Sequence, residues 1–262
     1  MRSFWWQPAL VVALLAGGVV TACETVPYTG RSQLQFMSPQ QGSELGVQAY
    51  QQALAKTKLS TDAAASEVVT RVGSRIAAIT GHPEYKWEYR LIQDDKQVNA
   101  FALPGGKVAV YTGILPITRD ENGLAAVLGH EIGHVIARHG GERVSQQMLV
   151  NVGLETTMAA LSSGNPATVQ AVASLLGAGA TVGVLLPWNR AQESEADHLG
   201  LILMAKAGYD PHAARDLWVR MAAASKGSAK PPEFLSTHPS EPTRIQQIEA
   251  WMPEAMQYYR PR

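Results

Sequence analysis

Residues 126–145 read AVLGHEIGHVIARHGGERVS and place three histidines within ten positions of one predicted helix. Successive helical residues are turned by about 100°, so the side chains of His130 and His134 project within roughly 40° of each other. Two imidazoles one turn apart can bind the same metal ion, and Glu131 lies between them to accept a proton from water. The string therefore predicts half of a site for one zinc ion, with Glu131 as its catalytic base.

The third histidine of the string, His139, lies nine residues after His130. This spacing turns its side chain to roughly the opposite side of the helix, so we do not expect it to bind the same metal ion. We expect His139 to be a cation near the C-terminus of the helix, where positive charge is favourable.

A catalytic zinc ion needs one more protein ligand and an open position. The best candidate is the stretch ESEAD at 193–197, where Glu193 and Asp197 share a helix face and Glu195 points away. We expect Glu193 to bind the metal and Asp197 to accept a hydrogen bond from a ligating histidine. The alternative is a solvated acidic face that pairs with Arg190.

The remaining pattern predicts a mostly α-helical α+β protein with a small β-sheet. Helices are expected over 38–56 and 62–79, and alternating apolar residues predict strands at 86–92, 98–103 and 107–113. Pro104-Gly105-Gly106 joins the last two strands as a tight hairpin. The chain is predicted to be helical for most of its length after Gly113.

Several residues are expected to begin or end these later helices. Thr118 and Glu121 form a capping-box pattern that opens a helix running to about His139. Asn189 caps the helix that carries ESEAD, and Gly208 ends it. Asp210-Pro211 begins another helix, and Ser240 caps the last one, which runs to about Met252.

Two apolar segments, 148–161 and 169–186, follow the histidine string. The second has 18 uncharged residues, at the lower limit for a membrane span, so we favour buried or membrane-facing helices. The alternative is a membrane-spanning hairpin formed by residues 148–186.

The N-terminus has the layout of an export signal: Arg2, then a 12-residue apolar run, then small residues that precede Cys23. Cys23 is the only cysteine in the chain, and its context resembles the lipobox of bacterial lipoproteins. We therefore expect a signal peptide over 1–22, a lipid-anchored tether over 23–37 and a catalytic domain over 38–262. Glu24 by resemblance favours the outer membrane. Acidic and basic residues balance at 22 each, which speaks against a nucleic-acid partner.

The order of HEIGH, ESEAD, VNAFALPGG, RHGGERVS and STHPSEPTRI resembles the gluzincin metallopeptidases of the HtpX and CAAX prenyl endopeptidase group. It is most similar to their periplasmic lipoprotein branch, which includes LoiP and the protease domain of BepA. The resemblance implies a zincin-like fold with Glu193 as third zinc ligand. It further implies that His238 and Arg244 stabilise the oxyanion, and that VNAFALPGG is an edge strand whose Asn99 and Ala100 bind substrate.

These features together predict a zinc endopeptidase of the cell envelope that cleaves unfolded or misfolded proteins. The reason is that a peptide bound at a strand edge is held mainly through its backbone, so its side chains matter little. Expected partners are such substrates, the membrane through Cys23, and outer-membrane assembly machinery or other envelope proteases. The competing hypothesis is a zinc-stabilised outer-membrane lipoprotein that acts as a chaperone or assembly factor. Glu131 favours the enzyme, because a structural zinc site does not need a base.

Overall fold

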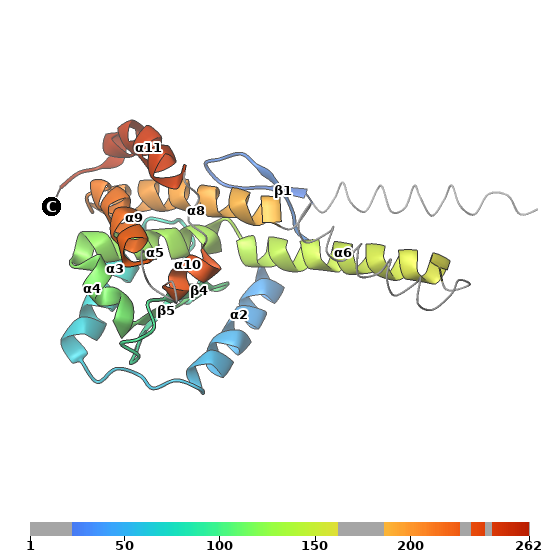
Figure 1. Cartoon of the computed structure of the whole chain (residues 1–262), viewed down its shortest axis with the longest axis horizontal. Helices are drawn as coiled ribbons and strands as arrows, with labels where there is room; N and C mark the ends of the chain where they lie inside the picture. Colours follow the sequence, from blue (N-terminus) through green and yellow to red (C-terminus); the bar gives the residue numbers. More distant parts are fainter. Residues whose placement is uncertain (1–22, 162–185, 226–231, 239–242, 262) are drawn as a thin grey trace, which may run out of the picture.

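The computed structural model describes residues 23–161, 186–225, 232–238 and 243–261 (Figure 1). A three-stranded sheet with the order β3-β5-β4 contains β3 (Glu88–Ile92), β5 (Lys107–Tyr111) and β4 (Ala100–Leu103). The central strand β5 is parallel to β3 and antiparallel to β4. The three predicted strands are confirmed, and β4 is an edge strand of this sheet.

Helices cover both faces of the sheet. On one face α2 (Pro39–Leu54) packs Tyr50 against Ile92 and Ala109. On the other face, α3 (Ala63–Ala78) and α5 (Glu121–Ile136) enclose the main core with Val108 and Val110 of β5. Because β5 is apolar on both sides, the sheet holds the histidine-bearing α5 against its inner face.

Local sequence signals start these elements as predicted. The Ser38 side chain accepts a hydrogen bond from the backbone of Gln41 and the reciprocal bond is present, so α2 begins with a complete capping box. Asp62 caps α3 by accepting a hydrogen bond from Ala65. The β4–β5 hairpin turns through Gly105 and Gly106, both at a positive φ that favours glycine.

The closest helix packing is between α5 and α8 (Leu186–Lys206), which cross through small residues. A Cβ atom added to Gly129 would lie 2.8 Å from the carbonyl oxygen of Gly200, and one added to Gly133 would lie 2.9 Å from that of Ala196. Side chains at these positions would push the helices apart. The crossing therefore brings His130 and His134 on α5 close to Glu193 and Asp197 on α8.

The other elements surround this pair of helices. Figure 1 shows α6 extending away from the helical body; α11 packs on α8, and α9 packs on α5 and α11. The remaining elements are β1 (Cys23–Thr25), β2 (Ser32–Leu34), the 3₁₀ turn η1 (Thr112–Ile114), α4 (Leu115–Thr118), α6 (His139–Leu161), α9 (His212–Ser225), α10 (Glu233–Thr237) and α11 (Arg244–Tyr258).

Three predicted helix ends are wrong. Thr118 belongs to α4, and the backbone reverses at Arg119 (φ 69°), so Asp120 caps α5 by accepting a hydrogen bond from Gly123. Asn189 lies inside α8, which begins at Leu186. The last helix continues past Met252 to Tyr258 with Pro253 inside it, since the buried Ala255 packs in the core.

The predicted ends at Gly208 and Asp210-Pro211 agree with the structure, since α8 ends at Lys206 and α9 begins at His212. Ser240 and the apolar segment 169–185 lie outside the described residues. Among the described helices, none is long and apolar enough to cross a membrane.

The segment expected to form a tether has regular structure. β1 and β2 pair antiparallel, with Cys23 opposite Leu34, and β2 packs on α6. Val26, between the strands, is buried with Ala137 and Leu199. The N-terminal hairpin, defined here as residues 23–35, therefore packs on the same helices that carry the histidine string and ESEAD.

We predict that Gly200→Ala lowers the free energy of unfolding by about 1–3 kcal/mol, the usual scale of overpacking. The added Cβ would lie 2.7 Å from the carbonyl carbon of Gly129. Urea unfolding measures the change. Gly42→Ala is the matched control, because its nearest neighbour would be Cβ of Pro104 at 3.9 Å, an ordinary contact distance. Equal effects of the two substitutions would contradict the close α5–α8 crossing.

Candidate metal centre and active site

The two histidines of the predicted pair converge. Both are buried, and their Nε2 atoms lie 3.1 Å apart. One turn of α5 separates them, as the spacing predicts. Burial lowers the pKa of His134, which favours the neutral imidazole that a metal ligand requires.

Glu193 on α8 faces both rings. Its Oε1 lies 3.3 Å from Nε2 of His134, and its Oε2 lies 3.4 Å from Nε2 of His130. Burial opposes ionisation of Glu193, but the surrounding histidines outweigh burial and lower its pKa. The carboxylate is therefore ionised and lies where the sequence analysis predicts a third ligand.

A fourth side chain, His238, joins this group. It follows α10, which is held by a hydrogen bond from the backbone N–H of Phe234 to the carbonyl oxygen of Val98. Nδ1 of His238 lies 3.1 Å from Nε2 of His130 and 3.0 Å from Oε2 of Glu193. The resemblance implies an oxyanion donor here, but the structure places His238 among the candidate ligands.

The four side chains fit a zinc ion. Zinc binds histidine nitrogen and carboxylate oxygen at about 2.0–2.2 Å, so tetrahedral ligand atoms lie about 3.3 Å apart. One ligand atom from each of His130, His134, Glu193 and His238 can be chosen within 4.8 Å of the others, and the contacts among them are 3.0–3.4 Å. Uncharged imidazoles with facing nitrogens cannot all hydrogen-bond one another, which favours a cation between them. The cluster can hold one metal ion.

Glu131 lies beside this cluster and is also buried. Its Oε2 accepts a hydrogen bond from the backbone N–H of Ala102 on β4, at 3.1 Å. Its Oε1 has no hydrogen-bond partner among the described residues and lies 3.3 Å from Nε2 of His238. Burial raises the pKa of the Glu131 carboxyl. An oriented carboxylate with one unsatisfied oxygen and a raised pKa is suited to accept a proton.

Asp197 supports His130. Its Oδ1 lies 2.9 Å from Nδ1 of His130, which is the hydrogen bond that the sequence analysis predicts. Burial opposes ionisation of Asp197, but the charge and hydrogen bonds of Arg244 and His130 together outweigh burial and lower its pKa. His130 can therefore keep its proton on Nδ1 and present the lone pair of Nε2 to a metal.

Arg244, for which the resemblance implies an oxyanion role, binds Asp197 in this structure. Its guanidinium forms a buried ion pair with Asp197, with Nε 2.6 Å from Oδ2, and stacks on Trp218. Its Nη2 also donates to Oδ1 of Asp197 at 2.7 Å. Arg244 thus fixes the carboxylate that binds His130, because α11 begins at Arg244 and brings its side chain to Asp197.

The prediction for His139 is correct in one part and wrong in the other. It is not a member of the ligand cluster, but it is buried at the start of α6 rather than a cation near the C-terminus of the preceding helix. Arg138, at φ 57°, breaks the helix, so His139 begins α6 and its ring turns back toward α5. Its Nδ1 lies 2.7 Å from Nδ1 of His134, and burial lowers its pKa. The sequence pattern did not predict this contact, because it indicates one continuous helix up to about His139.

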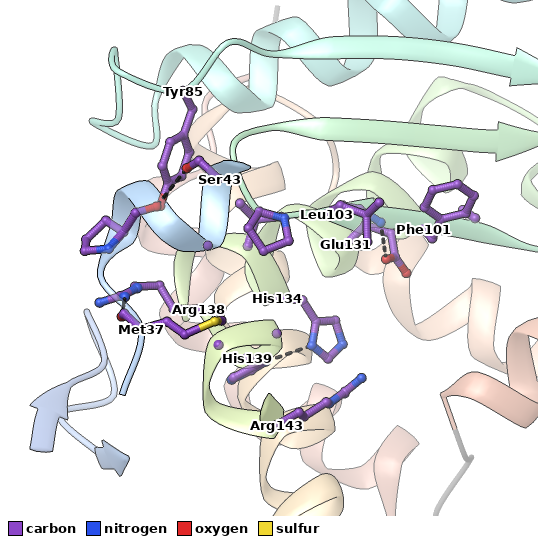
Figure 2. A pocket seen from close by; sticks show the side chains of 18 of the residues that line it. Met37, Ser43, Tyr85, Phe101, Leu103, Glu131, His134, Arg138, His139 and Arg143 are labelled. Carbon is purple, nitrogen blue, oxygen red and sulfur yellow. Dashed lines mark hydrogen bonds between the residues drawn. The ribbon is translucent and has the colours of Figure 1, made fainter. Parts of the chain in front are cut away.

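A groove of about 280 Å³ opens beside Glu131 and His134 (Figure 2). Asn99 and Ala100 line it together with the edge strand β4, as the resemblance implies. Apolar groups from α2, β4 and the chain before β3 form much of its wall. These are Met37, Pro39, Tyr85, Phe101, Leu103 and Pro104. The groove can accept an extended chain with apolar side chains next to the base.

A base with an unsatisfied oxygen, next to a cluster that can hold one metal, defines a metal-dependent hydrolase. The chain belongs to peptidase family M48, which matches residues 63–252, and it is a metalloendopeptidase whose cofactor is zinc. The mostly helical α+β fold that the sequence predicts is confirmed.

Several curated proteins are similar to this chain. The mitochondrial metalloendopeptidase OMA1 of Schizosaccharomyces pombe is 40% identical over 260 residues, which cover 97% of this chain and 74% of that protein. The human metalloendopeptidase OMA1 is 31% identical over 90% of this chain and 47% of its own length. The Beta-barrel assembly-enhancing protease of Yersinia pestis is 30% identical over 87% of this chain and 47% of its own length.

The family and the likeness to BepA-type proteases agree with the prediction, while the likeness to HtpX, CAAX prenyl endopeptidases and LoiP stays a prediction. The strong likeness to OMA1 enzymes does not follow from the quoted motifs. This chain spans about half the length of the human and Yersinia proteins.

His238→Ala distinguishes a metal ligand from an oxyanion donor. From the 3.0–3.1 Å contacts we predict that zinc affinity falls by at least about tenfold, while hydrolysis at saturating zinc is not reduced, because a coordination position opens. Chelator competition and peptide cleavage measure the two quantities. The exposed His212→Ala is the control. An unchanged zinc affinity with a loss of about 10²–10³ in kcat would instead assign His238 to the oxyanion.

Proposed function

We propose that this metalloendopeptidase cleaves extended, unfolded segments of cell-envelope proteins that add to the edge of β4. The observation that carries the proposal is the open edge of β4 beside Glu131 and the ligand cluster. In an antiparallel ladder, alternate residues turn their backbone groups toward the partner strand. The carbonyl oxygen of Asn99 accepts a hydrogen bond from the backbone N–H of Tyr111. The backbone groups of Ala100 and Ala102 therefore point away from β5, toward the edge of the sheet.

The edge groups are arranged for a peptide. The N–H of Ala102 is bonded to Glu131 and that of Ala100 to the side chain of Asn99. The carbonyl oxygens of both alanines remain to accept hydrogen bonds from the backbone of a substrate strand. Such pairing reads the backbone rather than the side chains, and it needs an unfolded segment.

In the proposed mechanism His130, His134 and Glu193 hold the zinc ion. When bound, zinc supplies a Lewis acid that polarises the scissile carbonyl and makes water more acidic. Oε1 of Glu131 takes the proton from the attacking water and later delivers it to the leaving amine. The Ala102 N–H holds the other oxygen of Glu131, so the same strand aligns both substrate and base. His238 lies in the same cluster, so its side chain would have to move before a substrate carbonyl could enter.

Glu131→Gln should abolish hydrolysis and leave zinc bound. Glutamine keeps the shape of the side chain but cannot accept the proton, and general-base catalysis contributes about 10²–10⁴ in rate. Cleavage of an unfolded protein, measured together with zinc stoichiometry, tests the role. Glu84→Gln, at an exposed glutamate outside the site, is the control. Wild-type cleavage by Glu131→Gln would remove the base from the mechanism.

We propose that the protein is exported and anchored by acyl chains on Cys23, facing the periplasm from the outer membrane. The support is the sequence of the first 24 residues, and the likeness to the Yersinia protease is compatible with it. Each acyl methylene buried in lipid contributes about 0.8 kcal/mol to membrane binding. Assembly machinery and other envelope proteases remain proposed partners.

For the anchor, Cys23→Ser should move the protein from the membrane fraction to the soluble fraction, because serine cannot form the thioether to lipid. Fractionation followed by mass spectrometry of the mature N-terminus is the measurement. Ser32→Ala, in the second strand of the hairpin, is the control. Retention of the serine variant in the membrane would contradict a lipid anchor as the sole attachment.

A further inference from the structure

The N-terminal hairpin contributes the side chains of Arg31 and Thr29 to a buried ionic cluster, in which the Thr29 hydroxyl donates to Oε1 of Glu195. Nη1 and Nη2 of Arg31 bind the two carboxylate oxygens of Glu142 at 2.7 Å each. Nε of Arg31 donates to Oε2 of Glu195 at 2.9 Å. The side chains of Glu142 and Glu195 are only 3% and 4% exposed, so Arg31 neutralises two buried carboxylates on two different helices.

The cluster continues to the metal centre through His139. Oε2 of Glu195 lies 3.0 Å from Nε2 of His139, and Nδ1 of His139 lies 2.7 Å from Nδ1 of His134. Figure 2 shows the last contact, with the ring of His139 turned toward His134. An unbroken chain of polar contacts therefore joins a residue of the hairpin to a candidate zinc ligand.

The protons of this chain can be assigned from its contacts. If Nε2 of His134 gives its lone pair to zinc, its Nδ1 carries the proton and donates to Nδ1 of His139. Neutral His139 then carries its own proton on Nε2, where Glu195 accepts it. One tautomer of each ring satisfies every contact, so the chain is fully hydrogen-bonded in the metal-bound state.

We propose that Arg31, through Glu195 and His139, positions the zinc ligand His134. The N-terminal hairpin thereby helps to set the ligand geometry and the zinc affinity of the metal centre. The proposal rests on the metal-binding role proposed above for His134. Arg31, Glu195 and His139 are positioning residues, because none of them is among the four side chains of the candidate ligand cluster and His139 acts through its contact with His134.

The other ligand histidine has a matching arrangement. His130 is held by Asp197, and Asp197 is held by the buried Arg244. His130 is thus connected to an arginine through one carboxylate, and His134 is connected to an arginine through His139 and then a carboxylate. The difference is that the arginine behind His134 comes from the hairpin rather than from the helices of the catalytic core.

Further contacts hold the hairpin in place. The side chain of Arg138, at the break between α5 and α6, pairs with Glu24 and donates to the carbonyl oxygen of Met37. At the turn of the hairpin, the hydroxyl of Tyr28 accepts a hydrogen bond from Lys206 of α8. Displacement of the hairpin would therefore withdraw Arg31 from both carboxylates.

The experiment measures zinc affinity of the full chain by chelator competition, with circular dichroism to confirm folding. Arg31→Ala and His139→Ala should each raise the Kd for zinc by about 10–100-fold, as for loss of a partner that orients a ligand. The exposed Arg215→Ala, whose contacts are on the surface, should change nothing. If Arg31→Ala does not fold, Arg31→Lys keeps the charge, loses the two-pronged contact, and should still raise the Kd.

Two substitutions of His139 separate positioning from simple stability. His139→Asn places an amide near the position of Nδ1, where it can accept from His134, but it does not reach Glu195. His139→Gln reaches Glu195 but leaves His134 without this acceptor. We expect asparagine to retain more zinc affinity than glutamine. In the His139→Asn background, Arg31→Lys should have no further effect on the Kd. The visible absorption of the cobalt-loaded protein should change in every variant that alters the setting of His134.

Multiplicative effects of Arg31→Lys and His139→Asn on the Kd would show independent roles and overturn the proposal. So would an unchanged Kd and cobalt spectrum in a folded Arg31 variant. Failure of the underlying function has a different signature: His134→Ala would then bind zinc as tightly as wild type. Hydrolysis need not be measured for either decision.

Discussion

The close crossing of α5 and α8 is the constraint on which the rest of the structure depends. Gly129, Gly133 and Gly200 allow backbone to approach backbone, so a carboxylate on one helix can meet two imidazoles on the other. Both helices are also packed in the core: Val127 and Leu128 of α5 are buried there, and α8 packs beside α11. The metal centre is therefore built on rigid elements, which is what precise ligand geometry requires.

The crossing also buries many charges, and the surrounding structure pairs them. Asp197 with Arg244, and Glu142 and Glu195 with Arg31, are ion pairs in which removal of one partner leaves a buried charge uncompensated. Such pairs are costly as sources of stability, but they fix orientation. Their placement directly behind His130 and His134 connects the electrostatics of the fold to the metal centre.

The edge of β4 links this centre to substrate. The N–H of Ala102 both orients Glu131 and belongs to the strand on which we propose the peptide lies. His238 approaches the same cluster from α10, so the ligand set is closed by a residue from a separate element. Glu131, the edge strand β4 and His238 therefore lie together beside the ligand cluster.

The sequence by itself determined the parts that depend on local periodicity. Helical spacing placed His130 and His134 on one face and Glu193 and Asp197 on another, and alternation located all three strands of the sheet. Capping by Ser38 and Asp62 was equally local. Only the tertiary structure decided what faces what. The break at Arg138 turns His139 inward, α11 brings Arg244 to Asp197, and His238 joins the cluster from the end of α10. The hairpin that replaces the expected tether likewise depends on Arg31 finding Glu142 and Glu195, more than 100 residues away. Spacing along the chain carries no information about such contacts, because they are set by how separate elements pack.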